Sequence, residues 1–512
     1  MRKINFCLIF IMLIVMFGTI IRNYNTENKG LFFYDEGIYV CSAKAKYLNL
    51  INKFGIKEKI TEKDAVLKQH IGKISPNFIT GSKIGFVFFI FLSFFLFGIN
   101  AYSPLLVSVF FGALTILLVY LIARRVYNEN IALLSAVVLA VSSMHIMYSR
   151  CALPQAASIF FLFLAFYFYV VFLGNKKYIY AILCALTVGL AFTVHYNLLL
   201  MLPLFVFFEA FRLFFIDKNE SKKFMKIAAF SAAVILPVIF WQAVTVIDQI
   251  YKLGFYPVTY FGELKTSFTA IAGQTKNKID PFFSLFYFQK MEGWIVFIFF
   301  IFGVISLIKK LRKNFNMAEF VLLVLALFPI VWYGFYPHLR VLRSFSPVLP
   351  AMAIIVSYKI ITFCFWEKIK PFGRFLAPVL TLAVIIMGVT GFRPIIELKS
   401  CYGDVVKYLY ENKVGAKGPS PLLLSYVDEM YPVFAYYMGG DVVAINKLDD
   451  VGAYGRTPLL VNIFTYNKAL AGVTPYKVFK QVSFSAHNAE GGSKDKYVTK
   501  NIPTQDVCLY RK

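Results

Sequence analysis

The chain has 512 residues, of which 59% are hydrophobic and only 16% are charged, and 53 Lys and Arg residues outnumber 27 Asp and Glu residues. Soluble domains carry about 25% charged residues, so this composition excludes an ordinary soluble protein and is typical of a polytopic membrane protein. The net charge of +26 does not indicate a nucleic-acid partner, because the basic residues lie in short runs between apolar segments and no nucleic-acid-binding motif accompanies them.

The first apolar run follows the basic N-terminal sequence Met-Arg-Lys. It is longer than the apolar part of a usual signal peptide and no small-residue cleavage site follows it, so we expect an uncleaved signal-anchor helix with its N-terminus in the cytoplasm. Runs of about 20 predominantly apolar residues are long enough to cross a bilayer. By this criterion the predicted spans are residues 4–21, 103–122, 131–148, 155–173, 178–194, 197–213, 226–247, 293–308, 317–334, 346–365 and 375–391.

Basic residues in the short loops predict the orientation, because they favour the cytoplasmic side. Five basic clusters alternate along the chain, and one topology places all of them in the cytoplasm: 124–125, 176–177, 212–226, 309–313 and 368–374. The opposite segments are then expected outside: 22–102, 149–154, 195–196, 248–292, 335–345 and everything after 392.

Two of the outer loops are long enough to carry structure of their own. Residues 22–102 are expected to contain interfacial helices, and parity makes 84–99 a re-entrant or interfacial element, with a short tilted span as the alternative. Aromatic residues recur through 248–292, a pattern typical of amphipathic segments that lie on a membrane surface.

Composition changes near residue 392, where the long apolar runs stop and Gly, Asp and Asn become more frequent. Helices are predicted at 402–412 and 428–438, and strands at 421–427, 441–446, 458–464 and 479–485. The expected architecture is therefore a polytopic α-helical membrane domain, 1–391, with about 11–13 transmembrane helices, and a small α/β extracytoplasmic domain, 392–512. Cys401 and Cys508 bracket that second domain, and both a disulfide and two separate thiols remain open.

The adjacent carboxylates Asp35 and Glu36 are the most informative feature of the first outer loop, because acidic residues are scarce in this chain. The sequence contains no phosphate-binding P-loop, no Gly-x-Ser-x-Gly elbow and no His-Glu-x-x-His motif. A nucleotide-dependent reaction is therefore not supported, and chemistry would have to use groups at the outer face.

The predicted topology gathers further polar and aromatic residues on that same face. They are Tyr34, Tyr39, His70, Lys83, Arg150, His195, Tyr196, His338, Arg340 and Arg343. A carboxylate can take the proton of an acceptor hydroxyl, while Arg, Lys or a metal ion neutralises the charge of a departing phosphate. This combination favours transfer of a group from a lipid phosphate.

Each of these residues also has a purely structural interpretation. Asp35 and Glu36 fit the start of a helix, as we expect for the second such pair, Asp428 and Glu429. The arginines can be explained as anchors of helix ends at the lipid head groups, the lysines as surface charges, and His195 as a hydrogen-bonded structural histidine.

Three short motifs, in this order, resemble the GT-C glycosyltransferases, and above all the branch that holds the protein O-mannosyltransferases and the lipid A aminoarabinose transferase. The motifs are Tyr-Asp-Glu-Gly-Ile-Tyr at 34–39, Tyr-Ser-Arg-Cys-Ala-Leu-Pro-Gln at 148–155 and Arg-Ser-Phe-Ser-Pro-Val-Leu-Pro at 343–350. The resemblance covers about residues 1–391. Many members carry an acid where this chain has Gln155.

The resemblance implies inverting transfer of a sugar, hexosyl or pentosyl, from a polyprenyl-phosphate donor to a protein, lipid or glycan acceptor outside the cytoplasm. The catalytic acid of the family maps to Asp35, with Glu36 beside it. We therefore predict these two as catalytic residues that could also hold a divalent metal ion. The predicted ligands of the donor phosphate are Arg150, Arg343, Lys83 and Arg340. The predicted substrate pocket comprises Tyr34, Tyr39, His70, His195, Tyr196 and His338.

Two other functions would suit a membrane protein with these features. A transporter, flippase or polymerase of lipid-linked sugars would place ionisable residues near the middle of several helices, whereas here they gather at one face. A receptor or scaffold would explain the C-terminal domain but not Asp35 and Glu36. Membrane lipids are expected partners under all three hypotheses, and nucleic acid under none.

Overall fold

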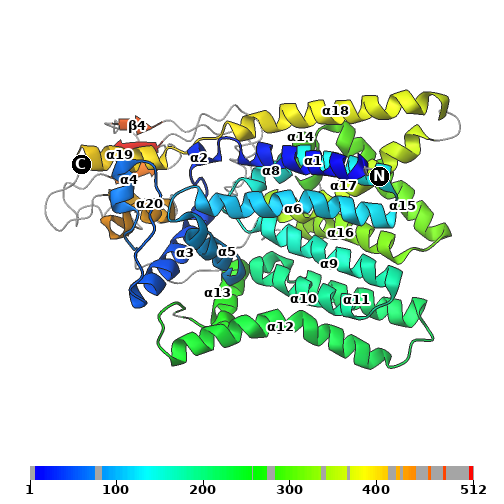
Figure 1. Ribbon diagram of the computed structural model, residues 1–512, viewed down its shortest axis with the longest axis horizontal. Coiled ribbons are helices and arrows are strands. Elements are labelled where there is room, and N and C mark those ends of the chain that lie inside the picture. The colour runs from blue at the N-terminus through cyan, green and yellow to red at the C-terminus, as the bar shows by residue number, and fades with distance from the viewer. Residues whose placement is uncertain are drawn as a thin grey trace, which may run out of the picture.

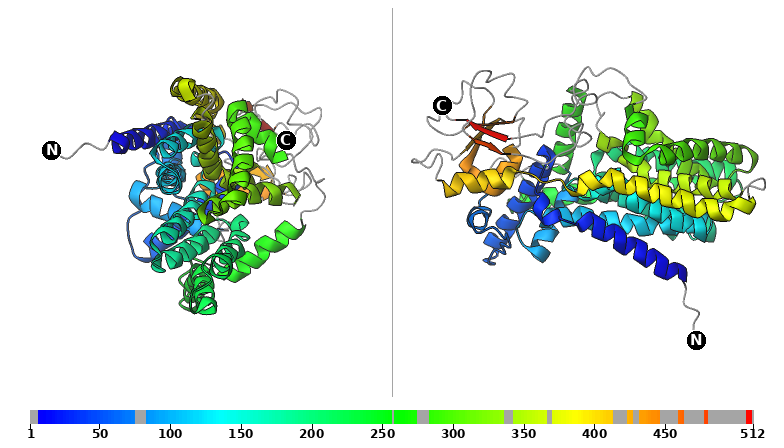
Figure 2. Two further views of the ribbon diagram at one scale, coloured as in Figure 1. Left: turned by 90° about the vertical axis from the view of Figure 1, so that its right-hand side faces the viewer. Right: turned by 90° about the horizontal axis from the view of Figure 1, so that it is seen from above.

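The computed structural model describes residues 6–74, 83–256, 258–273, 283–335, 342–365, 370–412, 423–426, 431–445, 459–462, 477–479 and 507–510. Long helices lie side by side in one bundle, and shorter helices and a small sheet lie at one end of it (Figures 1 and 2). A mostly helical membrane architecture was predicted from the sequence, and it is confirmed.

Eight of the described helical segments are long and apolar enough to cross a membrane. They are α1 with α2 (Phe6–Asn23 and Thr26–Lys29), α6 (Ser103–Val126), α9 (Gln155–Asn175), η2 through η3 (Tyr196–Ile216, with α11 at Met201–Phe211), α12 (Lys223–Ile250), α15 (Trp294–Lys313), η5 with α17 (Leu342–Val348 and Leu349–Cys364) and α18 (Lys370–Ile396). Three shorter apolar helices accompany them: α5 (Ile84–Phe97), α10 (Ile179–Val194) and α16 (Met317–Phe335). Every predicted span except 131–148 therefore coincides with one of these apolar helices.

The span predicted at 131–148 is not one helix but two, α7 (Glu129–Val141) and α8 (Ser143–Ser149), which meet at an angle of 62°. Ser142 has an extended backbone and its hydroxyl accepts a hydrogen bond from the N–H of His145, so it ends one helix and begins the next. Side chains supply the hydrogen bonds that the break removes. Arg22 donates to the carbonyl oxygens of Leu139 and Ala140.

The amide side of the same bend is held by Glu292, the last residue of α14 (Phe283–Glu292). Its Oε1 accepts hydrogen bonds from the Ser142 hydroxyl at 3.0 Å and the Met144 N–H at 2.9 Å. Burial raises the pKa of this carboxyl to about 7, and the hydrogen bonds from Ser142 and Met144 oppose that rise. The bend is thus fixed by two side chains that lie far away in the sequence.

The segment after α1 forms α3 (Tyr34–Lys53), α4 (Ala65–His70) and α5 at the end of the bundle, where α13 (Tyr260–Gly273) also lies (Figure 1). Helix α5 has 14 residues and is about 21 Å long, which is shorter than the apolar core of a bilayer. It packs against α3, α6 and α10. The re-entrant or interfacial placement of 84–99 stays a prediction.

The described residues after 400 contain α19 (Tyr402–Glu411), α20 (Tyr431–Met438) and five strands. The strands are β1 (Leu423–Tyr426), β2 (Val442–Ile445), β3 (Leu459–Asn462), β4 (Lys477–Phe479) and β5 (Val507–Tyr510), in the order β2-β1-β3-β5-β4. β1 pairs in parallel with β2 and β3, and β5 pairs antiparallel with β3 and β4. The predicted cap at Asp428 and Glu429 lies outside the described residues.

Helix α20 packs directly on α3, so the C-terminal region contacts the segment that carries Asp35. A Cβ added at Gly37 would lie 2.5 Å from the carbonyl carbon of Pro432, so this contact requires glycine. Buried Lys44 donates to the carbonyl oxygens of Ile71 at 2.9 Å and Tyr436 at 2.5 Å. The position of α3 therefore depends on residues from both parts of the chain.

Candidate functional site

Asp35 lies in the first turn of α3 and forms an ion pair with Arg343, whose Nη2 is 2.7 Å from the carboxylate Oδ2. Arg343 belongs to η5, the 3₁₀ turn that leads into α17. Both side chains retain about a quarter of their exposure, so the pair remains accessible. Burial tends to raise the pKa of Asp35, but the positive charges of Arg343 and Lys83 outweigh it and hold this pKa below its ordinary value.

Lys83 stands at the start of α5 with a left-handed backbone, and its ammonium group is hydrogen-bonded to the hydroxyl of Tyr39. Its charge interacts with both Asp35 and Arg343. Burial lowers the pKa of Lys83 to about 8, and the neighbouring carboxylate of Asp35 opposes this shift. The site therefore contains one carboxylate and two cations, drawn from α3, α5 and η5.

His195 and Gln155 border the same site from the ends of α10 and α9. Their side-chain nitrogens are 3.3 Å apart, and both side chains are buried. His195 lies within electrostatic reach of Lys83 and Arg343. Tyr196 holds the backbone beside it, because its hydroxyl accepts the N–H of Lys83 at 3.0 Å.

Glu263 on α13 is a member of this neighbourhood that sequence reasoning missed. Its carboxyl lies against Tyr196 and interacts with the charges of Lys46 and Lys83. Its Oε1 is buried and has no hydrogen-bond partner among the described residues. Burial raises the pKa of Glu263 to about 7, against the lowering effect of Lys46. Its position could have been noticed in the sequence, because Glu263 is an acid within the aromatic stretch 248–292 that is predicted to lie on the membrane surface.

Glu36 points away from the ion pair, although it follows Asp35 in the sequence. Its Oε2 accepts the N–H groups of Phe32 at 2.5 Å and Phe33 at 2.8 Å, and its Oε1 accepts the N–H of Ala152 at 2.6 Å. The side chain is fully buried, with Lys29 at 3.8 Å. Both oxygens are therefore occupied by groups that fix the start of α3 against the segment after α8.

Arg150 is not brought to Asp35 either. Its Nη1 donates to the carbonyl oxygens of Ile21, Arg22 and Tyr24, and its Nη2 donates to Ile396. These carbonyls belong to the C-terminal ends of α1 and α18, and the guanidinium is completely buried. Arg150 therefore caps the ends of these helices, and its Nη1 and Nη2 donors are used by carbonyl oxygens rather than directed at a phosphate site.

Replacing Arg150 with Lys is expected to lower stability by about 1–3 kcal/mol, because several buried carbonyl oxygens would lose their donor. The Michaelis constant for a lipid-phosphate substrate should remain within about twofold of wild type. Thermal unfolding in detergent and substrate titration of the same preparation measure the two quantities. A large increase in the Michaelis constant with unchanged stability would contradict the capping role.

The remaining predicted residues divide into three groups. Tyr34 and Tyr39 lie on the first turns of α3, next to Asp35. His70 is stacked on Tyr410 of α19, with ring centroids 3.5 Å apart, so the structure places it against the C-terminal region instead of the ion pair. His338 and Arg340 lie outside the described residues.

The two adjacent acids do not fit a metal site. Glu36 uses both oxygens for backbone N–H groups, and Asp35 faces two cations, which would repel a divalent ion. Among the described residues no three His, Cys, Asp or Glu side chains gather in the manner of a metal site.

Comparison with known proteins identifies the fold of this chain. Residues 84–241 match the sequence profile of the dolichyl-phosphate-mannose-protein mannosyltransferases. The structure also matches ArnT from Cupriavidus metallidurans bound to undecaprenyl phosphate, with a TM-score of 0.57 and 11% identity over 99% of this chain and 98% of that one. The chain has the GT-C fold of the mannosyltransferase and ArnT type.

A second GT-C structure, the oligosaccharyltransferase of Archaeoglobus fulgidus in its apo form, is similar with a TM-score of 0.58 and 13% identity. The match covers 86% of this chain but only 64% of the archaeal one, so the chain spans about two thirds of that enzyme. Among curated protein sequences none matches this chain. At these identities the likeness shows the GT-C fold, and any activity has to be argued from the site.

Proposed function

We propose that this protein transfers a sugar, with inversion at its anomeric carbon, from a polyprenyl-phosphate donor to a hydroxyl acceptor on the outer face of the membrane. The observation that carries the proposal is the ion pair of Asp35 with Arg343, with Lys83 beside it. A carboxylate and two cations, the groups that the proposed reaction needs, are thereby brought together from distant segments. The GT-C fold and the mannosyltransferase profile support the same reaction class.

In the proposed reaction the Asp35 carboxylate accepts the proton of the acceptor hydroxyl. The acceptor oxygen then forms a bond to the anomeric carbon as the bond between that carbon and the phosphate oxygen breaks. The polyprenyl phosphate leaves with the bonding electrons, and Arg343 and Lys83 neutralise its charge. Glu36 acts as a positioning residue, because it fixes the turn of α3 from which Asp35 projects.

The ion pair couples donor binding to the strength of the base. A donor phosphate would draw Arg343 and Lys83 away from Asp35, since both cations make charge-assisted hydrogen bonds to phosphate. Because these two charges hold the pKa of Asp35 low, their engagement by phosphate raises that pKa and makes the carboxylate a better proton acceptor. The base is therefore activated when the donor is present.

The proposed orientation follows from the basic loops, which favour the cytoplasm. The N-terminus and the end of the bundle opposite Asp35 would lie in the cytoplasm, and the region after 392 would lie outside. Contacts of α20 with α3 place that region where it could help to select the acceptor. The sugar is a hexose or a pentose in this proposal, and the acceptor is a protein, lipid or glycan.

The direct test uses purified protein in liposomes with radiolabelled polyprenyl-phosphate sugars and a panel of acceptor extracts. We expect one polyprenyl phosphate to be released for each glycosidic bond formed. If labelled sugar instead crosses the bilayer and no new glycosidic bond appears, the protein is a transporter and the proposal is wrong.

Arg343→Gln should raise the donor Michaelis constant by about 10–100-fold, because a charge-assisted hydrogen bond to phosphate is lost. It should also raise the pKa of Asp35, since Arg343 lowers it, and so move the acid limb of the rate profile to higher pH. Steady-state kinetics between pH 4 and 9 measure both effects. The matched control is Arg393→Gln, an exposed arginine at the end of α18.

Glu263→Gln should move the alkaline limb of the donor kcat/KM profile to lower pH. Lys83 must be protonated to hold phosphate, its pKa is about 8, and Glu263 is one of the charges that raise it. Removing that negative charge lowers the pKa of Lys83, so binding fails at lower pH. Glu27→Gln removes an exposed outer carboxylate and should leave the profile unchanged. An unaltered alkaline limb in the Glu263 variant would contradict the role of this residue.

A further inference from the structure

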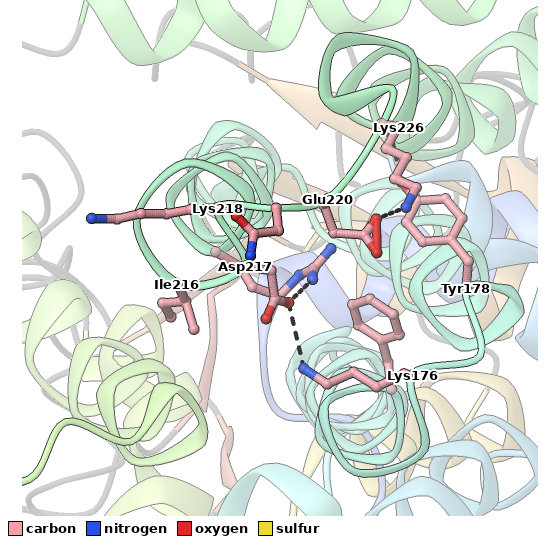
Figure 3. Close-up of a pocket in the computed structure, with 10 residues that line it drawn as sticks. Lys176, Tyr178, Ile216, Asp217, Lys218, Glu220 and Lys226 are labelled. Carbon is pink, nitrogen blue, oxygen red and sulfur yellow. Dashed lines mark hydrogen bonds and ion pairs between the residues drawn. The ribbon is translucent and has the colours of Figure 1, made fainter.

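A cavity of about 650 Å³ lies at the end of the bundle away from Asp35, between the end of α9, the start of α10, the π-helical turn η3 (Arg212–Ile216) and the start of α12 (Figure 3). Helix α9 links the two ends: Gln155 at its start contacts His195, whereas Lys176 at its end lines the cavity. A helix of 21 residues is about 30 Å long, so this cavity is a separate site at the opposite end of the bundle.

Charged side chains from three segments point toward one another in this cavity (Figure 3). Asp217 accepts from Lys176 at 3.4 Å and is paired with Arg212, while Glu220 is paired with Lys226. Arg212 is nearly completely buried and is held from behind by Glu209 at 2.7 Å. Lys218 also lines the cavity but extends away from these pairs (Figure 3). The segment 212–226 as a whole carries five cations and two carboxylates, so this end of the bundle is net positive.

The surface beside the cavity carries exposed aromatic side chains that could contact lipid acyl chains. Phe214 and Phe215 of η3 and Phe224 at the start of α12 are exposed large aromatics on the segment that carries the cavity's charges. Lys223 lies over the ring of Phe214, with its ammonium 5.5 Å from the ring centroid. Exposed aromatic rings interleaved with lysines are typical of a segment at the boundary between acyl chains and head groups.

We propose that this cavity binds the phosphate of an anionic phospholipid from the leaflet opposite Asp35. Lys176 and Lys226 contact the phosphate, and the acyl chains lie beside the exposed phenylalanines. Arg212 acts as a positioning residue, because its ion pairs with Glu209 and Asp217 fix the turn that carries Asp217. The proposal is independent of sugar transfer.

The experiment is native mass spectrometry of the full-length protein in detergent, titrated with phosphatidylglycerol or phosphatidylcholine. We expect tighter binding of phosphatidylglycerol. Removing both lysines, Lys176→Gln with Lys226→Gln, should weaken it by about 25-fold, which corresponds to about fivefold for each lysine near an anionic head group. Binding of phosphatidylcholine should remain unchanged.

A variant that is expected to bind the lipid more tightly distinguishes a lost contact from misfolding. Glu220→Gln removes a carboxylate that competes with the phosphate for Lys226, so it should tighten binding of phosphatidylglycerol by about fivefold. A misfolded protein would not bind more tightly. The matched control is Lys309→Gln with Lys313→Gln, two exposed lysines of α15 that do not line the cavity.

Two results would overturn the proposal. The first is that the double variant at Lys176 and Lys226 binds phosphatidylglycerol as tightly as the α15 control does. The second is that glycerol 1-phosphate displaces the lipid at equal concentration, because the cavity would then take a soluble phosphate and the apolar surface would contribute nothing. Sugar transfer is not measured, so neither result bears on the reaction proposed for Asp35.

Discussion

Asp35→Asn is expected to lower the rate of sugar transfer by about 10²–10⁴-fold, the usual contribution of a general base. The amide keeps the size of the carboxylate but cannot accept the acceptor proton. Donor binding should persist or become tighter, because Arg343 and Lys83 lose the carboxylate that competes with the donor phosphate. Transfer assays give the rate, and equilibrium binding of a labelled polyprenyl-phosphate sugar gives the affinity.

Folding has to be shown intact in this variant, and its matched control is Asp404→Asn. That residue is an exposed carboxylate of the C-terminal region whose nearest cation is Lys399 at 3.6 Å. Unchanged thermal unfolding together with lost transfer would assign chemistry to Asp35. Retention of wild-type transfer by the Asp35 variant would remove the basis of the proposed function.

Glu36→Ala is expected to act in a different way, by lowering the free energy of unfolding by about 3–5 kcal/mol. Three buried N–H groups would lose their acceptor, and Lys29 would remain charged and buried without its partner. Thermal or urea unfolding in detergent measures the loss. The control, Glu27→Ala, removes an exposed carboxylate and should change stability by less than about 1 kcal/mol.

The roles of Asp35 and Glu36 can thus be distinguished by experiment. A stable but inactive Glu36 variant would show that this carboxylate takes part in the chemistry after all. A destabilised variant whose remaining folded fraction is active would establish the positioning role.

The positions of the membrane helices could be predicted from the sequence because a chain in lipid must satisfy its backbone hydrogen bonds internally, which leaves long apolar helices as the solution. The bend at Ser142 could not be predicted from the sequence. Its missing hydrogen bonds are supplied by Arg22 and Glu292, more than 100 residues away in either direction, and no local pattern indicates such a partner.

The sequence predicted Asp35 and Arg343 on one membrane face but did not predict their ion pair. The same reasoning could not separate Arg343 from Arg150, because an arginine at a helix end looks alike in sequence whether it faces a phosphate or four carbonyl oxygens. It also could not separate Asp35 from Glu36. One residue along a helix turns a side chain by about 100°, which here is the difference between an accessible ion pair and a buried cap.

The contacts of Arg22 and Arg150 have a consequence for the order in which the protein is made. Helix α1 is synthesised before α7 and α8, and the carbonyls that receive Arg22 and the guanidinium that caps α1 follow it by roughly 120 residues. At a synthesis rate of 5–20 residues per second, Arg22 is without these partners for about 6–24 s. We therefore expect α1 to take its final position only after α7 and α8 have been made, because burying Arg22 earlier would leave its charge without these acceptors.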